Sequence, residues 1–425
     1  MDREINDLEY LYYGLGQPYN IAIMLRIKGT INIELLKTIF KNIQTRHPLL
    51  KARIDKSNGK IPRLISEHVG EIPIKILKKI DDSQSKQEFD GQLMIPFDFT
   101  SENLPLIRAV ILQSEGFSDL ILCSLHMISD GLSMVYLARD IIQYLNNPNE
   151  PVILLDVPGK NQDIFPKKIR RMIPKTALPL YLLYPFLKLF HKLKFSFNKR
   201  KTNVPAVPKS NKDELAIYSF NLTEKQTDEI IQRCKREKVT VHCAICTAFL
   251  PDVTAINNPV NLRNRLSVSI GESFGLFVGA TVVKKKYRES QNFWTNARNY
   301  QKKLRWHLRD RQVYFPQRLL SKAISLSFME KIGIMYVDLL SNQKPFAVTN
   351  LGSLDKLQLT LDSDKYSIES FYGGVSPILD AFSVLVFTLR KKMFFHMHFL
   401  KSKYELSNIE DLANNIMKRL FDASN

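Results

Sequence analysis

Cysteine is scarce in this sequence, with 4 in 425 residues. All four lie in apolar or helical contexts, which predicts reduced thiols in a cytoplasmic protein rather than a disulfide framework. The N-terminus, MDREINDLEY, is charged and has no apolar segment of the kind found in a secretory signal. The chain also lacks low-complexity tracts and repeats at the periods of solenoid proteins. These absences favour a globular cytoplasmic protein.

The motifs of several enzyme and binding classes are absent too. There is no GxSxG or SxxK nucleophile motif, and the glycines of residues 271–279 have GxxxGxxxG spacing, which fits neither a dinucleotide fingerprint nor a phosphate loop. Cys243 and Cys246 form a single CxxC at helical spacing, so buried helical cysteines are favoured over a zinc or redox site. His396 and His398 have no third ligand nearby in sequence, which favours a structural role. We therefore expect no metal and no permanently bound cofactor.

Acidic residues are outnumbered by basic ones, 42 to 61, which gives a net charge of +19. Such a surface can attract nucleic acid, an anionic membrane, acidic proteins or phosphate-bearing ligands. No zinc-finger spacing and no RNP-like aromatic strand accompanies the charge, so nucleic-acid binding is disfavoured. An acidic acyl carrier protein or the phosphates of coenzyme A would suit this surface.

The length and a hydrophobic fraction of 44% predict two domains with sizeable cores. Residues 147–212 hold nine prolines and two basic runs, which marks a junction. We expect an N-terminal domain over 1–160, a crossover over 161–212 and a C-terminal domain over 213–425. The apolar stretch 177–190 is too short to span a bilayer. A packed crossover is the favoured interpretation of it, with a lid over an acyl channel or membrane-surface contact as alternatives.

Hydrophobic periodicity predicts an α/β protein with mixed sheets. The helices are expected at 6–13, 33–46, 132–145, 223–237, 241–250, 290–311 and 408–421, with one or two more within 317–340. The strands are expected at 20–28, within 62–80, at 105–112, 120–125, 214–222, 259–267 and 345–354, and as a hairpin over 383–400.

The strongest chemical signal is His126-Met-Ile-Ser-Asp130-Gly131, between the apolar strand at 119–125 and the helix from 132. A histidine where a strand meets a loop is displayed in the way functional groups usually are. Asp130 stands at an N-cap position, and Gly131 suits a tight corner. A neutral imidazole can take the proton of a hydroxyl as its oxygen attacks a thioester. The alternative is a core histidine whose nitrogens are satisfied by hydrogen bonds.

This segment resembles the HxxxDG motif of the coenzyme-A-dependent acyltransferase superfamily, which includes chloramphenicol acetyltransferase, phthiocerol dimycocerosyl transferase and the condensation domains of peptide synthetases. Two features of relatives are missing: the first position of HHxxxDG is Leu125, and the plant-type DFGWG motif is absent. Four further segments resemble family motifs in the expected order: 44–53 (QTRHPLLKAR), 105–108 (PLIR), 260–265 (VNLRNR) and 349–352 (TNLG).

The resemblance implies two chloramphenicol acetyltransferase-like subdomains in a V-shaped pair with a tunnel between them. His126 would be the general base in mid-tunnel. Asp130 would be structural and pair with Arg263 across the domain boundary. Thr349 would stabilise the tetrahedral oxyanion, with Asn350 supporting the same strand tip.

The implied function is transfer of an acyl group from acyl-CoA or an acyl carrier protein to a hydroxyl acceptor, without a covalent intermediate. These thioesters would be co-substrates of a monomer that is cytoplasmic or peripheral to a membrane. The alternatives are a stand-alone condensation enzyme that forms an amide, a non-catalytic module that binds a carrier protein or lipid, and a membrane-surface protein acting through 177–190.

Overall fold

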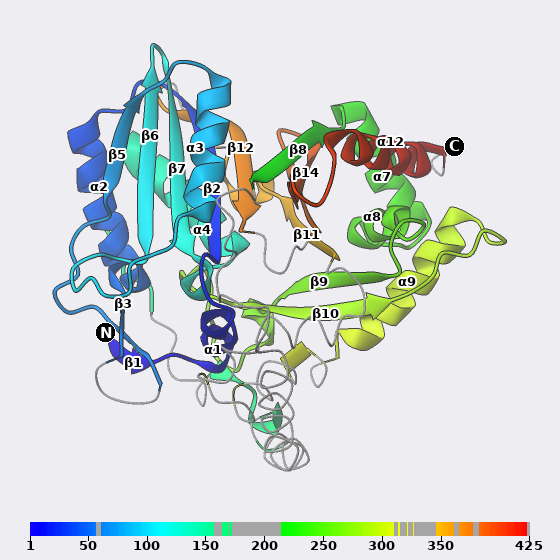
Figure 1. Ribbon diagram of the computed structural model, residues 1–425, viewed down its shortest axis with the longest axis horizontal. Helices are drawn as coiled ribbons and strands as arrows, with labels where there is room; N and C mark the ends of the chain where they lie inside the picture. Colours follow the sequence, from blue (N-terminus) through cyan, green and yellow to red (C-terminus); the bar gives the residue numbers. More distant parts are fainter. Residues whose placement is uncertain are drawn as a thin grey trace, which may run out of the picture.

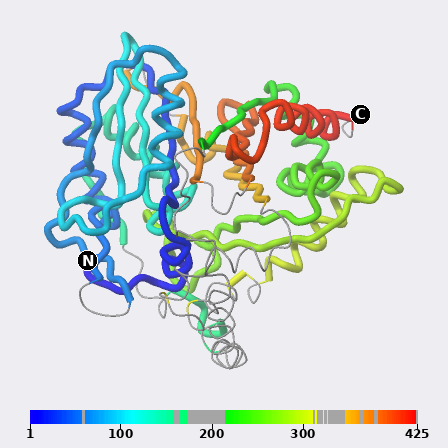
Figure 2. Tube along the Cα trace, in the orientation of Figure 1, coloured from blue at the N-terminus to red at the C-terminus, as the bar shows by residue number. Residues whose placement is uncertain are grey.

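The computed structural model describes residues 1–56, 61–156, 164–169, 171, 214–309, 313–314, 321, 326, 346–360, 365–376 and 382–422. Two halves lie side by side, each built on a mixed sheet with helices packed against it (Figure 1). The predicted α/β class with mixed sheets is confirmed. The two chain ends lie on opposite sides of the molecule (Figure 2).

The first half is organised around β7, the apolar strand that leads to His126. Every residue of β7 except the first is buried, because helices cover both faces of its sheet: α3 lies in front of the strands and α4 behind them (Figure 1). All neighbours in the sheet are antiparallel except β5 and β6. In spatial order the strands are β12 (Ser367–Val375), β2 (Asn20–Lys28), β7 (Phe117–Leu125), β6 (Ile107–Ser114) and β5 (Ile74–Lys78). The helices are α1 (Asp7–Gly14), α2 (Ile33–Arg46), α3 (Asp82–Met94) and α4 (Gly131–Asn146), with 3-10 turns η1 (Pro48–Lys51) and η2 (His126–Ile128).

A small antiparallel sheet flanks this half, formed by β1 (Asp2–Glu4), β4 (Arg63–Ile65) and β3 (Arg53–Asp55). The second half has six strands in the order β10 (Val278–Lys284), β9 (Ala255–Asn261), β11 (Phe346–Ser353), β13 (Phe382–Leu389), β14 (Lys392–Leu400) and β8 (Leu215–Asn221). Its helices are α7 (Glu224–Arg236), α8 (Val241–Phe249), α9 (Phe293–His307) and α12 (Leu406–Asp422), with η3 (Arg263–Arg265) and η4 (Asp355–Leu357). A second hydrophobic core lies between these helices and the sheet.

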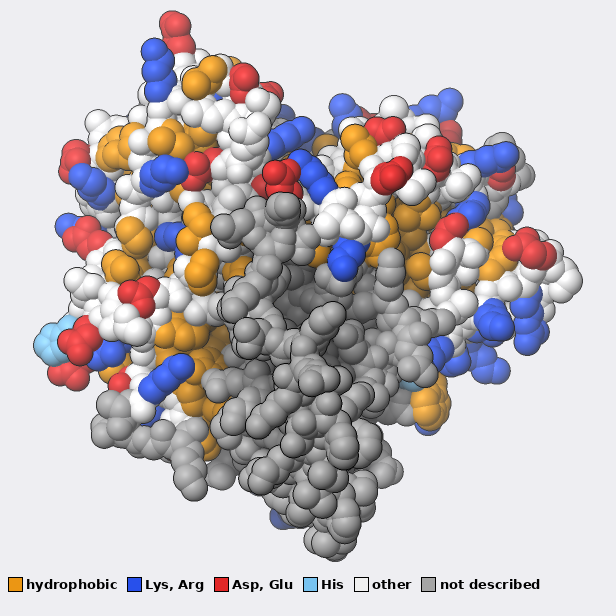
Figure 3. Space-filling view, in the orientation of Figure 1, with side chains coloured by type: hydrophobic (Ala, Val, Ile, Leu, Met, Phe, Trp, Pro, Cys, Tyr) orange, Lys and Arg blue, Asp and Glu red, His pale blue; other side chains and the backbone are white. Residues whose placement is uncertain are grey.

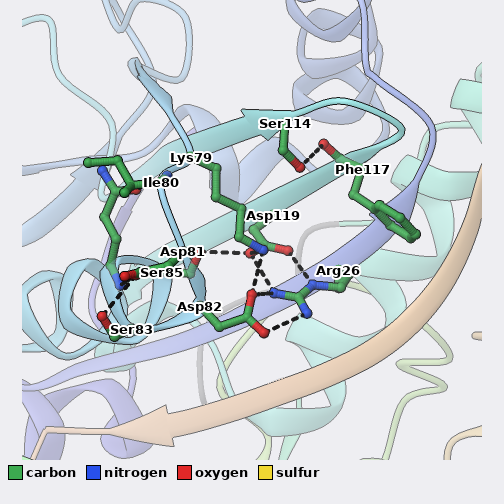
Figure 4. A network of polar contacts seen from close by, with 11 residues as sticks. Arg26, Lys79, Ile80, Asp81, Asp82, Ser83, Ser85, Ser114, Phe117 and Asp119 are labelled. Atoms are coloured by element: carbon green, nitrogen blue, oxygen red, sulfur yellow. Dashed lines mark hydrogen bonds and ion pairs between the residues drawn. The ribbon is translucent and has the colours of Figure 1, made fainter.

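A polar network fastens α3 to the first sheet (Figure 4). Asp119 of β7 accepts hydrogen bonds from Arg26 at 2.9 Å and from Ser85 at 2.7 Å, and it pairs with Lys79 at 2.8 Å. Burial alone would raise the pKa of Asp119, but these bonds outweigh it and the pKa is lowered. Asp82, at the first position of α3, pairs with the same Arg26, so the start of the helix is fixed against β2 and β7.

Strand β12 links the halves in a way that the sequence did not indicate. It lies within residues 213–425, yet it pairs antiparallel with β2 at the edge of the first sheet. Ser376, directly after it, donates to the carbonyl of Leu93 at 2.6 Å and accepts from the amide of Asn20 at 2.9 Å. The division at 160 and 212 stays a prediction, because residues 157–163, 170 and 172–213 lie outside the described part of the chain. The stretch 177–190 falls there as well.

Most of the expected helices and strands are found close to their predicted bounds, including the β6–β7 and β13–β14 hairpins. The strand expected at 259–267 is an exception, because β9 ends at Asn261 and Arg263–Arg265 form the turn η3. Helix α3 and strands β1 and β12 were missed. Helix α3 is mostly polar and presents little more than Phe89 and Leu93 to the core, so its apolar stripe is thin. Strand β12 contains Gly373 and Gly374, which weaken a strand pattern. The helices expected within 317–340 lie outside the described residues except at 321 and 326. Among the described residues, no helix is long and apolar enough to cross a membrane.

Candidate active site

His126 directly follows β7 and opens the turn η2, where its side chain is almost fully buried. Its Nδ1 lies 2.7 Å from the carbonyl oxygen of Ser129. A carbonyl can only accept a hydrogen bond, so Nδ1 carries the proton and the neutral ring has its lone pair on Nε2. Within the described residues Nε2 has no hydrogen-bond partner. The ring is therefore held as a base with one unoccupied nitrogen, unlike a core histidine with both nitrogens satisfied.

Two tyrosine rings enclose this imidazole. Tyr12 of α1 and Tyr19 before β2 each have a ring centroid 4.9 Å from that of His126, and they stack on each other at 5.1 Å. The amide of His126 also donates to the carbonyl of Tyr19 at 2.9 Å. Burial among these rings lowers the pKa of His126 from its ordinary value and raises that of Tyr12. The sequence prediction missed both tyrosines, although four tyrosines between residues 10 and 19 were a usable signal.

Asp130 points away from His126 and towards the second half. As the N-cap of α4 it accepts from the amide of Ser133 at 2.8 Å. Its carboxylate also pairs with Arg263 at 2.9 Å and accepts from the amide of Phe277 at 2.8 Å. The pair with Arg263, implied by the family resemblance, is present in the structure, with both side chains about 95% buried. Asp130 thus fixes the turn after His126 to the other half of the molecule.

Arg263 connects further groups to the same turn. It donates to the hydroxyl of Ser133 at 2.7 Å, and its guanidinium lies 4.7 Å from the ring centre of Phe277. The Ser133 hydroxyl in turn donates to the carbonyl of Gly275 at 2.6 Å. The segment 273–277 therefore belongs to the site, although the sequence assigned it no role there.

Gly131 is required by packing rather than by its dihedral angles. A β-carbon at this position would lie 2.9 Å from Cδ2 of Leu351, closer than such contacts normally are. Leu351 belongs to the TNLG tip of β11, so the tip approaches the start of α4. Asn350 accepts from the amide of Gly352 at 2.8 Å and supports the tip itself. Thr349 is half-buried on the same strand, and its oxyanion role stays a prediction.

A second set of ion pairs joins the halves next to the first. Asp140 of α4 accepts from Arg46 at 2.6 Å and lies 2.9 Å from Nε2 of His47, while Arg139 contacts both Asp140 and Glu272. Burial would raise the pKa of Asp140, but its bonds to these three cationic or imidazole groups outweigh it and lower the pKa to about 2. His47 is buried at the end of α2.

The remaining sequence motifs have structural positions. Arg108 donates to the carbonyls of Gln92 and Ile95, each at 2.7 Å, and so caps the end of α3. All four cysteines are buried free thiols. His396 and His398 both contact the carbonyl of Gly373. In the described part of the chain there is no group of three or more residues able to hold a metal.

Comparison with known proteins finds a likeness to condensation domains over part of the chain. Residues 11–152 match the family model of the condensation domain. The predicted resemblance to condensation domains is confirmed for this part of the chain. One of the plipastatin synthase proteins of Bacillus subtilis (strain 168) is 29% identical over 139 residues, which are 32% of this chain and 5% of that protein. Bacitracin synthase 1 of Bacillus licheniformis is 20% identical over 288 residues, which are 65% of this chain and 5% of the other. The chain thus spans about one twentieth of the length of these curated relatives.

Solved structures show a likeness of fold over nearly the whole chain. The first condensation domain of the calcium-dependent antibiotic synthetase, in complex with a substrate analogue, superposes with a TM-score of 0.72 at 10% identity and covers 100% of this chain and 96% of that one. Trichothecene 15-O-acetyltransferase from Fusarium sporotrichioides gives 0.67 at 11% identity, with 100% and 95% covered. Polyketide synthase associated protein 5 from Mycobacterium tuberculosis gives 0.64 at 15%, with 98% and 97% covered. These likenesses establish the fold that was expected, while the tunnel stays a prediction.

Proposed function

We propose that the protein is an acyltransferase that moves an acyl group from a thioester to a hydroxyl acceptor. The observation that carries the proposal is the state of His126, with Nδ1 bonded to the Ser129 carbonyl and Nε2 free of partners among the described residues. The lowered pKa keeps the imidazole neutral at physiological pH, which is the form that a general base requires.

The proposed chemistry has two proton transfers at Nε2. First, Nε2 takes the proton of the acceptor hydroxyl as its oxygen attacks the thioester carbonyl, which gives a tetrahedral intermediate. The carbon–sulfur bond then breaks, and the departing thiolate receives the proton back from Nε2. The products are an ester and a free thiol, and no covalent enzyme intermediate is formed. The Thr349 hydroxyl is the proposed donor to the oxyanion.

The thioester donor is proposed to be acyl-CoA or an acyl group on the phosphopantetheine arm of a carrier protein. The carboxylate of Asp130 and the terminal nitrogens of Arg263 are engaged with each other and with the segment 273–277, so these two residues support the turn that carries His126. Amide formation with an amine acceptor is the second candidate, and the match of residues 11–152 to the condensation domain is the observation that favours it.

The test offers acyl-CoA and acyl-pantetheine donors of several chain lengths with a panel of alcohols and amines, and it follows thiol release and product mass. His126→Ala should lower turnover by about 10²- to 10⁴-fold, the usual contribution of a general base, with an unchanged melting temperature. His68→Ala is the matched control, because the side chain of His68 is 78% exposed. Full activity of the His126 variant would remove the base from the mechanism. If no acyl transfer occurred with any donor and acceptor, a non-catalytic binding module would be the better explanation.

A further inference from the structure

A basic groove runs along the outer face of α9 in the second half. Five cations and one tryptophan line it: Lys238, Arg298, Lys302, Arg305, Trp306 and Arg309. The groove has a volume of about 500 Å³, and none of the described residues that line it is acidic. Lys and Arg side chains gather over this side of the molecule (Figure 3).

The cations form a stripe rather than a compact cluster. Arg298, Lys302 and Arg305 follow one another at intervals of four and three residues, so they lie on one side of α9, and Arg309 comes just after the helix ends at His307. At about 1.5 Å per residue the helical part of the stripe is roughly 10 Å long. Such a stripe matches acidic groups repeated along an extended surface, such as one helix of a partner protein.

The stripe is positioned rigidly and is short of counter-charges. The buried Gln301 accepts from the amide of Thr240 at 2.7 Å and donates to the carbonyl of Lys238 at 2.8 Å, which holds Lys238 beside α9. Of the five cations, only Arg298 has an acidic partner among the described residues, Glu237 at 2.7 Å. The side chains of the four others are exposed and have no acidic partner in the described part of the chain.

Trp306 gives the groove an apolar contact point. Its side chain is 49% exposed, whereas the other tryptophan, Trp294, is 6% exposed in the core. Tryptophan and arginine are the residue types most enriched at the energetic centres of protein interfaces. A half-exposed indole among arginines therefore points to a protein partner rather than to solvent alone.

The C-terminal end of the groove is connected to the candidate active site. Arg265 donates to the carbonyl of Leu308 at 2.8 Å, and it stands two residues after Arg263, which pairs with Asp130. A partner docked along α9 would therefore lie at the end of the second half that also holds the HxxxDG turn.

We propose that this groove docks an acidic helix of the carrier protein that bears the acyl thioester, an inference that rests on the proposed function. A nucleotide bisphosphate would engage one turn of cations and leave the rest of the stripe unused. An anionic membrane would contact a convex or flat surface, whereas this one is hollowed. Of these three ligands, only the carrier protein would contact the whole length of the stripe, its positive charges and the indole of Trp306.

The test compares one acyl group on two donors, a small acidic acyl carrier protein and pantetheine. Lys302→Glu/Arg305→Glu should raise KM for the carrier-bound donor at least tenfold and leave kcat/KM for the pantetheine donor unchanged. Added salt should raise KM of the unmodified protein for the carrier-bound donor only, because screening weakens exposed charge pairs. Lys225→Glu/Lys418→Glu is the matched control, since both lysines are exposed on the second half outside the groove. Equal KM values in the two double variants would overturn the proposal.

Binding is measured separately through the fluorescence of Trp306, titrated with the phosphopantetheinylated carrier protein, with adenosine 3′,5′-bisphosphate and with anionic lipid vesicles. Saturable change with the carrier protein that is lost in Lys302→Glu/Arg305→Glu supports docking even if no acyl transfer is found, in which case only the proposed function fails. Turnover of the pantetheine donor without any response to the carrier protein rejects docking and leaves the proposed function in place. A response to the nucleotide or the vesicles instead of the carrier protein also rejects it.

Discussion

Replacing Asp130 by Asn tests whether this residue holds the halves together. Asn has nearly the same shape and is as good an N-cap, so the bond from the Ser133 amide is retained. The change removes the negative charge that pairs with Arg263 at 2.9 Å. It also places the side-chain NH2 group of Asn where the carboxylate oxygen accepts a hydrogen bond from the amide of Phe277, so that two donors face each other. Breaking a buried ion pair by removing one partner costs about 3–5 kcal/mol, because the other charge is left uncompensated. We expect Asp130→Asn to lower the free energy of unfolding by about that amount.

The assay is urea denaturation followed by tryptophan fluorescence, with Asp82→Asn as the matched control. Asp82 pairs with Arg26, but its side chain is 65% exposed, so its loss should cost at most about 1 kcal/mol. Arg263→Met in the Asp130→Asn background removes the orphaned charge, and the double-mutant cycle should show a coupling of about 2 kcal/mol or more. Additive effects, or an Asp130→Asn loss no larger than that of the control, would refute the argument.

Three further predictions concern protonation and packing. The acid limb of the kcat/KM profile should lie below pH 6.5, because burial lowers the pKa of His126; a limb above 6.5 would contradict its buried neutral state. The pKa values of His396 and His398 are lowered to about 3 and 4 by burial, so the unfolded chain takes up protons first as the pH falls below 6.5. Stability should then decrease between pH 6.5 and 4 by up to about 1.4 kcal/mol per pH unit for each histidine, and urea titrations of His396→Leu/His398→Leu should show a flatter dependence. Gly131→Ala should lower turnover by displacing Leu351, and Leu351→Ala should restore it; absence of rescue would mean that the contact is unimportant.

Much of the fold followed from local pattern. The runs of β-branched and apolar residues in β2, β6 and β7, and the amphipathic periods of α2, α4, α7 and α9, gave these elements close to their observed bounds. Helix α3 was missed because its stability comes from Arg108 and Asn20 at its C-terminal end and from the Asp119 network at its start. Those contacts join residues far apart in sequence, so no local sequence pattern predicts them.

The candidate site also contains residues that the sequence predicted and residues that it did not. His126, Asp130 and Gly131 could be found because six consecutive residues at a strand–helix junction carry the signal. The enclosure of the imidazole by Tyr12 and Tyr19 could not, because ring contacts depend on where α1 lies relative to η2. The role of segment 273–277 could not be predicted from the sequence either, because its hydrogen bonds to Asp130 and Arg263 are made by backbone amides and carbonyls, which nearly every residue type supplies.

The sequence alone determined the mixed α/β class, the strand–turn–helix that displays His126 and, through family motifs, the pairing of Asp130 with Arg263. Tertiary structure alone decided which imidazole nitrogen is free, because the Ser129 carbonyl fixes the proton on Nδ1. It also decided that β12 completes the sheet of the first half and that Gly131 makes room for Leu351. The physical reason is common to all three: hydrogen bonding and close packing are set by distances between residues, which the order of residues along the chain does not specify.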